Sequence, residues 1–149
     1  MNQVRFFLDQ YYLFSNYSSL PVKYKSVTYP TSEHAYQAAK FENNKEISTA
    51  IKNAQSPSEA KRISTEYKNL ERKNWEKIKL QTMSEIIHEK AKQHAEVQRK
   101  LLETGDAQIL ENSEDYFWGR GKDDSGQNHL GKIWMQIREE LRNNRLLTK

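Results

Sequence analysis

Apolar residues recur every three or four positions through much of the chain after residue 30, which is the period of a helix buried along one face. Two stretches show this period most clearly. The first carries Trp75, Ile78, Met83, Ile86 and Ile87, and the second carries Leu130, Ile133, Trp134, Ile137 and Leu141. They predict a long helix from about Arg72 to Lys92 and a last helix for which Asn128 is a candidate cap. The stripe of the last helix, Trp134 included, is expected in the core.

Shorter helices are marked by the residues that begin and end them. "TSEHAYQAAKF" has Thr31 or Ser32 available as N-cap, and "EISTAIKNA" is expected to form a second helix. "SPSEAKRISTEY" opens with a capping box in which Ser56 is the N-cap and Glu59 is the N3 residue. The helix that follows the long one is expected to stop at Gly105, because glycine is favoured just beyond a helix end.

The first 30 residues read as short strands and loops, since aromatic residues are dense in "VRFFLDQYYLFSNY". "PVKYKSVTYP" alternates around Lys25-Ser26 and predicts a small hairpin, although this dipeptide is a poor former of the tight hairpin turns. "AQILE" predicts another short strand. The fold class is therefore α+β and predominantly helical. With 149 residues and no internal repeat or linker, we expect one domain over residues 1–149.

Composition narrows the classes of protein. The chain has no cysteine, which excludes disulfides and thiolate metal sites and favours an intracellular compartment. Its four histidines show no metal-ligand spacing, so we expect no metal and no cofactor. No apolar run approaches the length of a membrane span, and the N-terminus lacks the apolar core of a signal peptide. A cytoplasmic protein without a membrane partner is expected.

Positive charge is concentrated in the first two thirds of the chain. Residues 1–100 hold 17 Lys and Arg against 11 Asp and Glu, whereas residues 101–149 hold 7 against 9. This excess is either the solvated face of long helices, which is the more common situation, or an electrostatic footprint for a phosphate-bearing partner. The charge pattern alone does not separate the two.

One helix and one glycine-rich segment carry candidate chemistry. Glu33, Gln37 and Lys40 are spaced at i, i+4 and i+7, which places them on one helical face. Such a polar stripe is ordinarily a solvent face, and it can also be the wall of a polar cleft. Glu33 lies in the first turn, where a carboxylate is stabilised by the helix dipole even without any catalytic role.

The glycine-rich segment begins after a group of acids. Glu111, Glu114 and Asp115 precede Trp118, and burial of an acid beside a tryptophan is one way to keep a general acid protonated. An ordinary acidic loop is the simpler reading of their spacing. Four of the five glycines follow, namely Gly119, Gly121, Gly126 and Gly131, before the last helix begins. We expect this loop and the helix N-terminus to offer amides to a phosphate group.

Several motifs in a fixed order are more specific than any one of them. "FSNY", "YPTSEHAYQAAKF", "NWEKIKLQTM", "LLETGD", "ILENSEDYFWGRG" and "GQNHLGKIWMQIR" together resemble the NADAR family of YbiA-type N-glycosidases over residues 7–138. The resemblance implies a compact, mostly helical domain that hydrolyses C–N glycosidic bonds of ribose-phosphate compounds. The implied substrates are early riboflavin-pathway intermediates or ADP-ribose attached to guanine, including ADP-ribosylated nucleic acid. It implies no metal.

The resemblance also assigns roles to single residues. Glu33, in the S-E-H motif, is the expected catalytic acid, and Asp115, in the D-x-x-W-G motif, is its expected catalytic partner. The residues expected to bind substrate are Asn16, Lys40, Trp75, Trp118, Gly119, Arg120, Gly121 and Asn128. Trp75 is either part of the site or helix-seam core, and Lys40 and Arg120 are phosphate contacts or solvent-exposed cations.

The chain departs from the family pattern in two places. The glycine usual in the early hairpin is replaced around Lys25-Ser26, and "RISTEYKNL" lacks a common glycine-arginine pair. A binding module for ADP-ribose or nucleic acid that has lost hydrolysis is the alternative to an enzyme. The sequence leaves the oligomeric state open.

Overall fold

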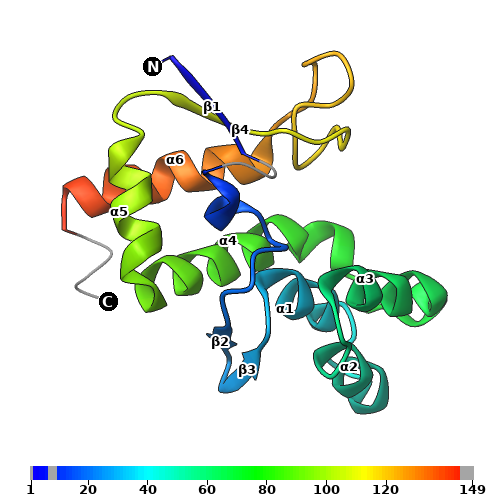
Figure 1. Ribbon diagram of the computed structural model, residues 1–149. Helices are drawn as coiled ribbons and strands as arrows, with labels where there is room; N and C mark the ends of the chain where they lie inside the picture. The colour runs from blue at the N-terminus through cyan, green and yellow to red at the C-terminus, as the bar shows by residue number, and fades with distance from the viewer. Residues whose placement is uncertain (1, 7–9, 145–149) are drawn as a thin grey trace. The chain divides into compact units, whose positions relative to one another are not determined.

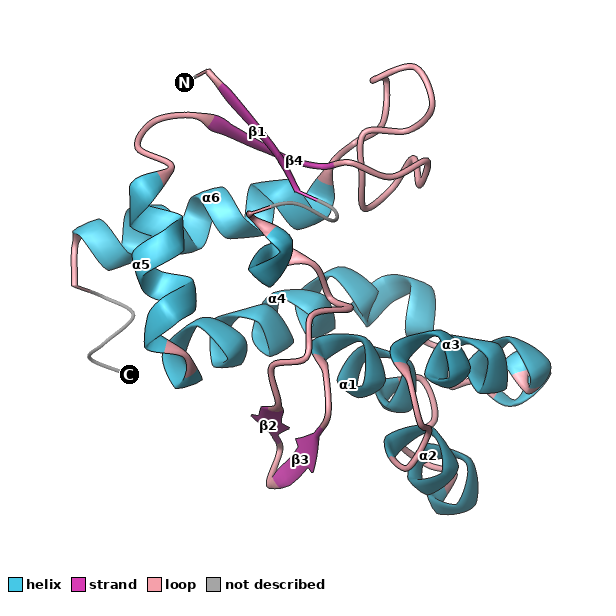
Figure 2. Cartoon of the chain, viewed as in Figure 1, coloured by secondary structure: helices cyan, strands magenta, loops and turns pink. Residues whose placement is uncertain are grey.

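The computed structural model describes residues 2–6 and 10–144. The chain forms two compact units, which we call the central unit (residues 16–90) and the terminal unit (residues 1–15 and 91–149). Six α-helices and four short strands lie within the described residues (Figure 1). The strands form only two short pairs and the rest of the regular structure is helical (Figure 2), which confirms the predicted helix-rich α+β class.

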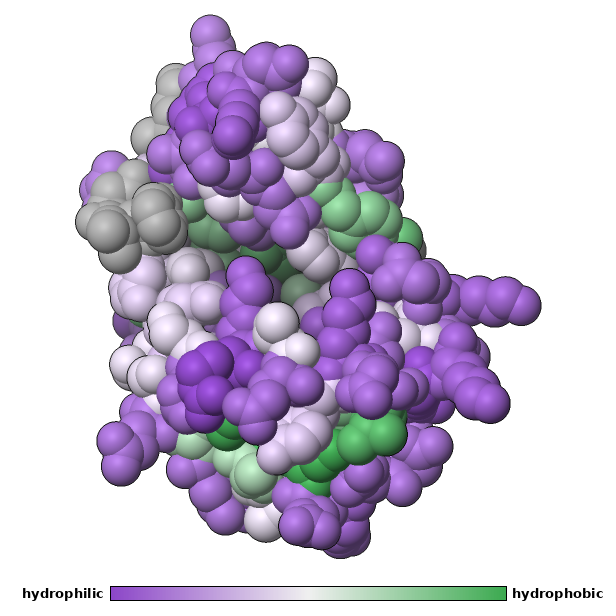
Figure 3. All heavy atoms as spheres, turned by 90° about the vertical axis from the view of Figure 1, so that its right-hand side faces the viewer, coloured by the Kyte–Doolittle hydropathy of each residue, from purple (hydrophilic) through white to green (hydrophobic). Residues whose placement is uncertain are grey.

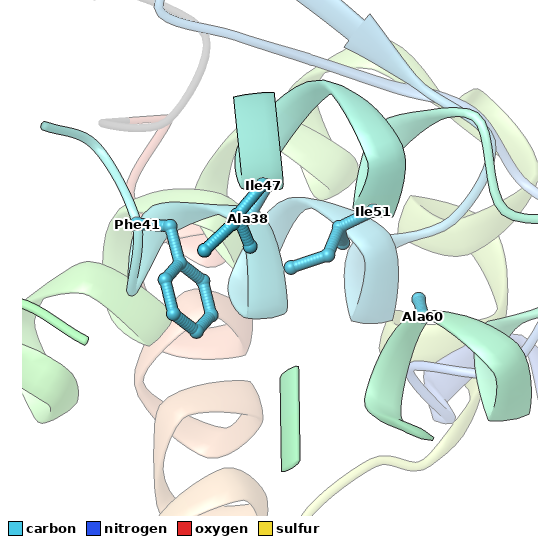
Figure 4. Packing of buried hydrophobic residues seen from close by; sticks show 5 residues of the cluster. All are labelled: Ala38, Phe41, Ile47, Ile51 and Ala60. Carbon is cyan, nitrogen blue, oxygen red and sulfur yellow. The ribbon is translucent and has the colours of Figure 1, made fainter. Parts of the chain in front are cut away.

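The central unit combines a β-hairpin with helices. Its elements are β2 (Val22–Tyr24), β3 (Val27–Tyr29), α1 (Ser32–Ala39), α2 (Lys45–Lys52), α3 (Pro57–Glu66), a short 3₁₀ helix (Lys68–Leu70) and α4 (Trp75–Gln93), the last three residues of which belong to the terminal unit. Helix α1 packs against both α2 and α3. Their shared core contains Ala38, Phe41, Ile47, Ile51 and Ala60 (Figure 4).

The predicted hairpin is confirmed, with Val22 opposite Tyr29 and Tyr24 opposite Val27. Lys25 and Ser26 form its turn with φ of 50° and 70°. A two-residue turn of this kind matches the twist of the strands when both residues have positive φ, a conformation that favours glycine or asparagine. The hairpin therefore forms in spite of its turn residues, and the two strands supply the stabilisation.

Side-chain caps begin three helices of the central unit. Thr31 Oγ1 accepts a hydrogen bond from the amide of His34 at 3.1 Å, and Asn44 Oδ1 accepts one from the amide of Ile47. Ser56 Oγ accepts one from the Glu59 amide at 3.0 Å, as predicted. The Glu59 carboxylate accepts from Arg62, so it supports the first turn of α3 as an ion pair.

The terminal unit brings together distant parts of the chain. Its elements are β1 (Gln3–Phe6), a 3₁₀ helix (Tyr12–Phe14), α5 (Ala95–Glu103), β4 (Gln108–Glu111) and α6 (His129–Arg142). Strands β1 and β4 pair in parallel, with Val4 opposite Ile109, and α6 packs against β4 and α5. As predicted, α5 is followed by Gly105 at a φ of 60°.

The apolar stripe of α6 is core, as predicted. Leu130, Ile133, Trp134, Ile137 and Leu141 are all buried. The Trp134 ring lies 5.0 Å from the Phe14 ring, and its Nε1 donates a hydrogen bond to the Phe14 carbonyl at 3.0 Å. A buried indole with its N–H satisfied by backbone is a packing residue, so Trp134 is not a platform for a ligand.

The surface is polar, in keeping with a chain in which 30% of the residues are charged. Figure 3 shows one face that is covered mainly by hydrophilic side chains, with a few small hydrophobic areas between them. Among the described residues, no helix has both the length and the apolar character needed to cross a bilayer.

Candidate active site

Glu33 is held at the N-terminus of α1 by a segment that precedes the hairpin. The Glu33 amide donates to the Asn16 carbonyl at 3.1 Å, and Ser32 Oγ donates to Asn16 Oδ1 at 3.0 Å. The Asn16 amide group in turn lies 3.5 Å from the sulfur of Met83. Asn16 therefore satisfies an otherwise orphan amide of the first helical turn and fixes where α1 begins.

The predicted polar face of α1 is buried within the protein. The side chains of Glu33 and Gln37 are only 7% and 3% exposed. Gln37 Nε2 donates a hydrogen bond to Glu33 Oε2 at 2.7 Å. This bond and the helix N-terminus both favour the ionised carboxylate, whereas burial disfavours it. A buried carboxylate fixed by its neighbour is what a reaction that develops positive charge needs.

Lys40 lies one turn beyond Gln37 and is half-buried against two aromatic rings. Its Nζ is 5.5 Å from the centroid of the Tyr36 ring and 5.9 Å from that of the Trp75 ring. Burial lowers the pKa of the Lys40 ammonium, while the carboxylates of Glu71 and Glu33 act in the opposite direction. A desolvated cation near a carboxylate can bind a phosphate group or balance the charge of Glu33.

Trp75 begins α4 and is 3% exposed. Its ring lies 5.2 Å from the Tyr36 ring at an interplanar angle of 58°. Trp75 is thus part of the core of the central unit, and one face of its ring contacts the Lys40 ammonium. The structure bears out the core reading of Trp75, and its part in a site stays a prediction.

The histidine of the S-E-H motif has a structural task. His34 is buried; its Nδ1 lies 2.8 Å from Thr31 Oγ1, and its Nε2 lies 3.0 Å from the carbonyl of Ala54. The ring therefore ties the cap of α1 to the end of α2. Sequence reasoning gave neither His34 nor Gln37 a role in the site. The signal for Gln37 was its i+4 spacing from Glu33.

Asp115 is placed differently from what the sequence suggested. It is exposed, and its Oδ1 accepts hydrogen bonds from the amides of Phe117 at 2.8 Å and Trp118 at 2.7 Å. Of the two readings of the acidic group, Asp115 follows the ordinary acidic loop and is not buried beside Trp118, because its carboxylate caps the turn from outside. The geometry gives Asp115 the task of holding the Phe117-Trp118 turn, where the two rings meet edge to face at 4.7 Å.

The amides of the glycine-rich loop are bonded within the terminal unit. The Gly119 amide donates to the Asp115 carbonyl, and the Arg120 amide donates to that of Glu111. The first amides of α6 follow the same pattern: those of His129 and Leu130 donate to the carbonyls of Phe117 and Trp118 at 3.0 and 3.1 Å. The amides of Gly119, His129 and Leu130 are therefore already used, and the phosphate cradle expected of Gly119, Gly121 and the α6 N-terminus stays a prediction that depends on the remaining amides.

The glycines serve close packing inside this loop. A Cβ on Gly121, which has a φ of 73°, would lie 2.4 Å from the Tyr116 ring, and one on Gly119 would lie 2.4 Å from Ser113 Oγ. Arg120 is also tied to the loop, since its Nε donates to Asn112 Oδ1 and its Nη1 to the Gly121 carbonyl. The loop is a folded connector that holds Trp118.

Asn128 precedes α6, as predicted, but its side chain does not cap the helix. With a φ of 54°, the residue turns its amide group toward β4: Oδ1 accepts from the Glu111 amide at 3.0 Å, and Nδ2 donates to the Ile109 carbonyl at 2.8 Å. Both polar atoms of the Asn128 side chain therefore bond α6 to β4. Neither of these bonds supports the predicted contact with substrate.

The expected site residues fall into two sets. Asn16, Glu33, Lys40 and Trp75 belong to the central unit, where the structure gathers them around α1. The others belong to the terminal unit, and they are Asp115, Trp118, Gly119, Arg120, Gly121 and Asn128. Within residues 2–6 and 10–144, no three His, Asp or Glu side chains come together as metal ligands.

Comparison with known proteins places the chain. The model of the NADAR domain matches residues 5–142. N-glycosidase YbiA of Escherichia coli is 40% identical over 134 residues, covering 89% of this chain and 83% of that protein. An N-glycosidase of Nostoc punctiforme is 40% identical over 136 residues, covering 89% and 87%. A chloroplastic riboflavin biosynthesis protein of Zea mays is 34% identical over 148 residues, covering 89% of this chain and 24% of that protein.

A solved structure agrees with these sequences. The NMR structure of Escherichia coli YbiA matches with a TM-score of 0.86 and 38% identity, covering 97% of this chain and 88% of that one. The resemblance read from the motifs is thereby confirmed, since the family model spans nearly the same residues as those motifs. This chain belongs to the NADAR family and is an N-glycosidase.

Proposed function

We propose that this N-glycosidase hydrolyses the bond between C1′ of a ribose and a nitrogen leaving group in ribose-phosphate compounds, with Glu33 as the carboxylate that acts at C1′. The observation that carries the proposal is the state of Glu33. Glu33 is buried in the first turn of α1, and its carboxylate is fixed by a 2.7 Å hydrogen bond from Gln37. A merely structural carboxylate in a first helical turn has no need of burial.

Cleavage of an N-glycosidic bond requires a fixed carboxylate of this kind. Breaking an N-glycosidic bond develops positive charge at C1′ and negative charge on the departing nitrogen. A fixed carboxylate near C1′ stabilises that positive charge or takes a proton from the attacking water. Lys40, half-buried between Tyr36 and Trp75, is the proposed contact for the substrate's phosphate. Trp75 forms the apolar wall beside it.

Asp115 is proposed to act through the turn that it holds and not as the proton donor. Its contacts with the Phe117 and Trp118 amides support this role. Trp118 is half-buried beside Phe117 and is the proposed stacking surface for a base. The proposal assigns no catalytic step to Arg120 or Asn128, because their side chains are bonded within their own unit, nor to Gly119 or Gly121, which have no side chain to act.

Two substrate classes are proposed: a phosphoribosylamino pyrimidine of the riboflavin pathway, and ADP-ribose on guanine, free or in nucleic acid. Relatives named as riboflavin biosynthesis proteins favour the first. The basic excess of residues 1–100 favours an anionic substrate of either class. We place the reaction in the cytoplasm, since a chain without cysteine gains nothing from an oxidising compartment.

Measuring product release from candidate substrates tests the proposal. The purified protein is incubated separately with a phosphoribosylamino pyrimidine and with an ADP-ribosylated guanine nucleotide, and free ribose 5-phosphate or ADP-ribose is followed by chromatography and mass spectrometry. We expect release from at least one substrate, and release about 100-fold slower or less by Glu33→Gln. Tight binding of ADP-ribose without any release would overturn the proposal in favour of a binding module.

A further inference from the structure

Gln37 carries a buried acceptor for which the described residues supply no donor. Its side chain is 97% buried, and Nε2 donates to Glu33 Oε2 at 2.7 Å. Its other polar atom, Oε1, has no hydrogen-bond partner among the described residues, and it is the one buried side-chain N or O atom of that part of the chain in this condition. An acceptor in this condition indicates a donor outside the described residues, such as a ligand or a water molecule.

The orientation of the amide follows from its neighbour. An ionised carboxylate can only accept hydrogen bonds, so the NH₂ group of Gln37 must face Glu33. Turning the amide over would set its oxygen against the carboxylate and lose the hydrogen bond. Oε1 is therefore the atom left over, and it is attached to the same carbon as the nitrogen that fixes Glu33. Because Oε1 and Nε2 are bonded to the same carbon, Oε1 lies close to the carboxylate that Nε2 holds.

Two adjacent acceptors suit one small molecule in particular. A water that donates one hydrogen to Glu33 and the other to Gln37 Oε1 has both hydrogens engaged. Its lone pairs then point away from the two residues, as a nucleophile requires. Glutamine orients attacking waters in this way in other hydrolases.

We propose that Gln37 positions the hydrolytic water, an inference that rests on the proposed role of Glu33. Gln37 Nε2 holds the carboxylate and Oε1 holds the water. The water oxygen forms a bond to C1′ while the C1′–N bond breaks, and that electron pair leaves with the nitrogen. Glu33 takes one proton from the water, and a proton from solvent or from Glu33 neutralises the departing group.

A ribose hydroxyl is the other O–H donor that could fill the place beside Oε1. The two differ in what they do to ligand affinity. A water-positioning residue contributes to the chemical step and leaves product binding unchanged, whereas a hydroxyl-binding residue contributes to the affinity for any ligand that carries the ribose. A split between kcat and Kd therefore separates them.

The test uses Gln37→Met, which keeps the length of the side chain and removes both polar atoms. We expect kcat to fall at least about tenfold while the Kd of ADP-ribose, measured by calorimetry, changes less than about twofold. Gln136→Met is the matched control, because Gln136 Nε2 donates to Glu140 Oε2 at 3.1 Å with the same i+4 spacing on an exposed face. It should change neither quantity.

The other outcomes overturn the proposal. A weaker Kd with kcat retained would assign Oε1 to a ribose hydroxyl, and no change in either quantity would leave Gln37 as packing. Activity of the wild type is measured in parallel: an inactive wild type defeats the proposed function, whereas an active Gln37→Met variant defeats only this inference.

Should Gln37→Met fail to fold, the unsubstituted protein answers the question. A high-resolution crystal structure is expected to show an ordered water bonded to both Gln37 Oε1 and the Glu33 carboxylate. A protein donor on Oε1 in that structure, or an Oε1 without such a water, would overturn the proposal.

Discussion

The N-terminal part of α1 and the loop from Ser113 to Asn128 both carry the polar residues expected of a site, and they use them in opposite ways. On α1 the polar side chains are buried, and one acceptor, Gln37 Oε1, has no donor in the described chain. In the loop, amides, carboxylate and guanidinium are bonded to neighbouring groups of the loop and β4.

The difference separates structural polar groups from reactive ones. A polar group that finds its partner within its own loop has its hydrogen-bonding capacity used, and it stabilises a conformation. A buried polar group without a partner is costly to keep, so its presence in a folded protein indicates a ligand or a solvent molecule. By this criterion we propose α1 as the reactive region and the glycine-rich loop as the scaffold that fixes Trp118.

The largest expected effect is on α1. Glu33→Gln should lower turnover about 100-fold or more, because the amide can neither take a proton nor stabilise positive charge at C1′. The melting temperature should change little, since a carboxylate at a helix N-terminus contributes about 0.3–1 kcal/mol. Glu140→Gln is the control, because Glu140 also accepts from a glutamine one turn away but lies in the terminal unit. An active Glu33→Gln enzyme would contradict the reactive role that we give to α1 and not to the loop.

The next effect is on stability and belongs to the terminal unit. A Cβ on Gly131 would lie 2.1 Å from the Ile109 carbonyl oxygen, a backbone atom that cannot move away without displacing β4. Gly131→Ala should therefore lower the free energy of unfolding by about 2–4 kcal/mol.

Gly105→Ala is the comparison for that variant. Gly105 has a positive φ but open space around it, so its replacement should cost only about 1 kcal/mol. Chemical denaturation of both variants gives the two numbers. Equal losses would show that α6 does not need the close approach at Gly131.

A third prediction concerns another buried polar group of the central unit. Burial lowers the pKa of the Lys90 ammonium to about 7, and its Nζ donates to Ser18 Oγ at 2.9 Å. In the unfolded chain this lysine keeps its ordinary pKa near 10.5. Between pH 7 and 10.5 the unfolded chain therefore binds more protons at Lys90 than the folded protein does. Lys90 accordingly makes the free energy of unfolding rise with pH over this range. Below pH 7 Lys90 is protonated in both the folded and the unfolded state, so the full cost of burying its charge lowers the free energy of unfolding.

Lys90→Met removes that penalty. The variant should be more stable than wild type by about 1–3 kcal/mol at pH 7, and the gap should narrow as the pH approaches 10. Thermal unfolding of both proteins from pH 6 to 10 measures it. A gap that does not depend on pH would mean that Lys90 stays charged in the folded state.

The smallest effect is expected where the loop has been given a structural role. Asp115→Asn retains the oxygen that accepts from the Phe117 and Trp118 amides, so turnover should stay within about threefold of wild type. Asp115→Ala removes that acceptor and should lower activity further while speeding amide exchange at residues 115–119. If both substitutions abolish turnover equally, the charge of Asp115 is catalytic and the loop is more than a scaffold.

Local features of the sequence were sufficient for much of the secondary structure. The caps at Thr31 and Ser56, the stop at Gly105 and the stripe of α6 depend on residues within one or two turns of each other, and each was confirmed. The shared face of Glu33, Gln37 and Lys40 followed from helical spacing for the same reason.

Tertiary structure alone decided which polar groups found partners within the described chain. The parallel pairing of β1 with β4 joins residues about a hundred positions apart, and no local pattern encodes it. Likewise, the loop offered amides and glycines that look the same whether they bind phosphate or one another. Only the positions of the carbonyls of Phe117 and Trp118 show that the amides are used. A hydrogen bond depends on where two groups meet in space, which is why the sequence could place Glu33, Gln37 and Lys40 on one face but could not show that the amides of His129 and Leu130 are bonded within the protein.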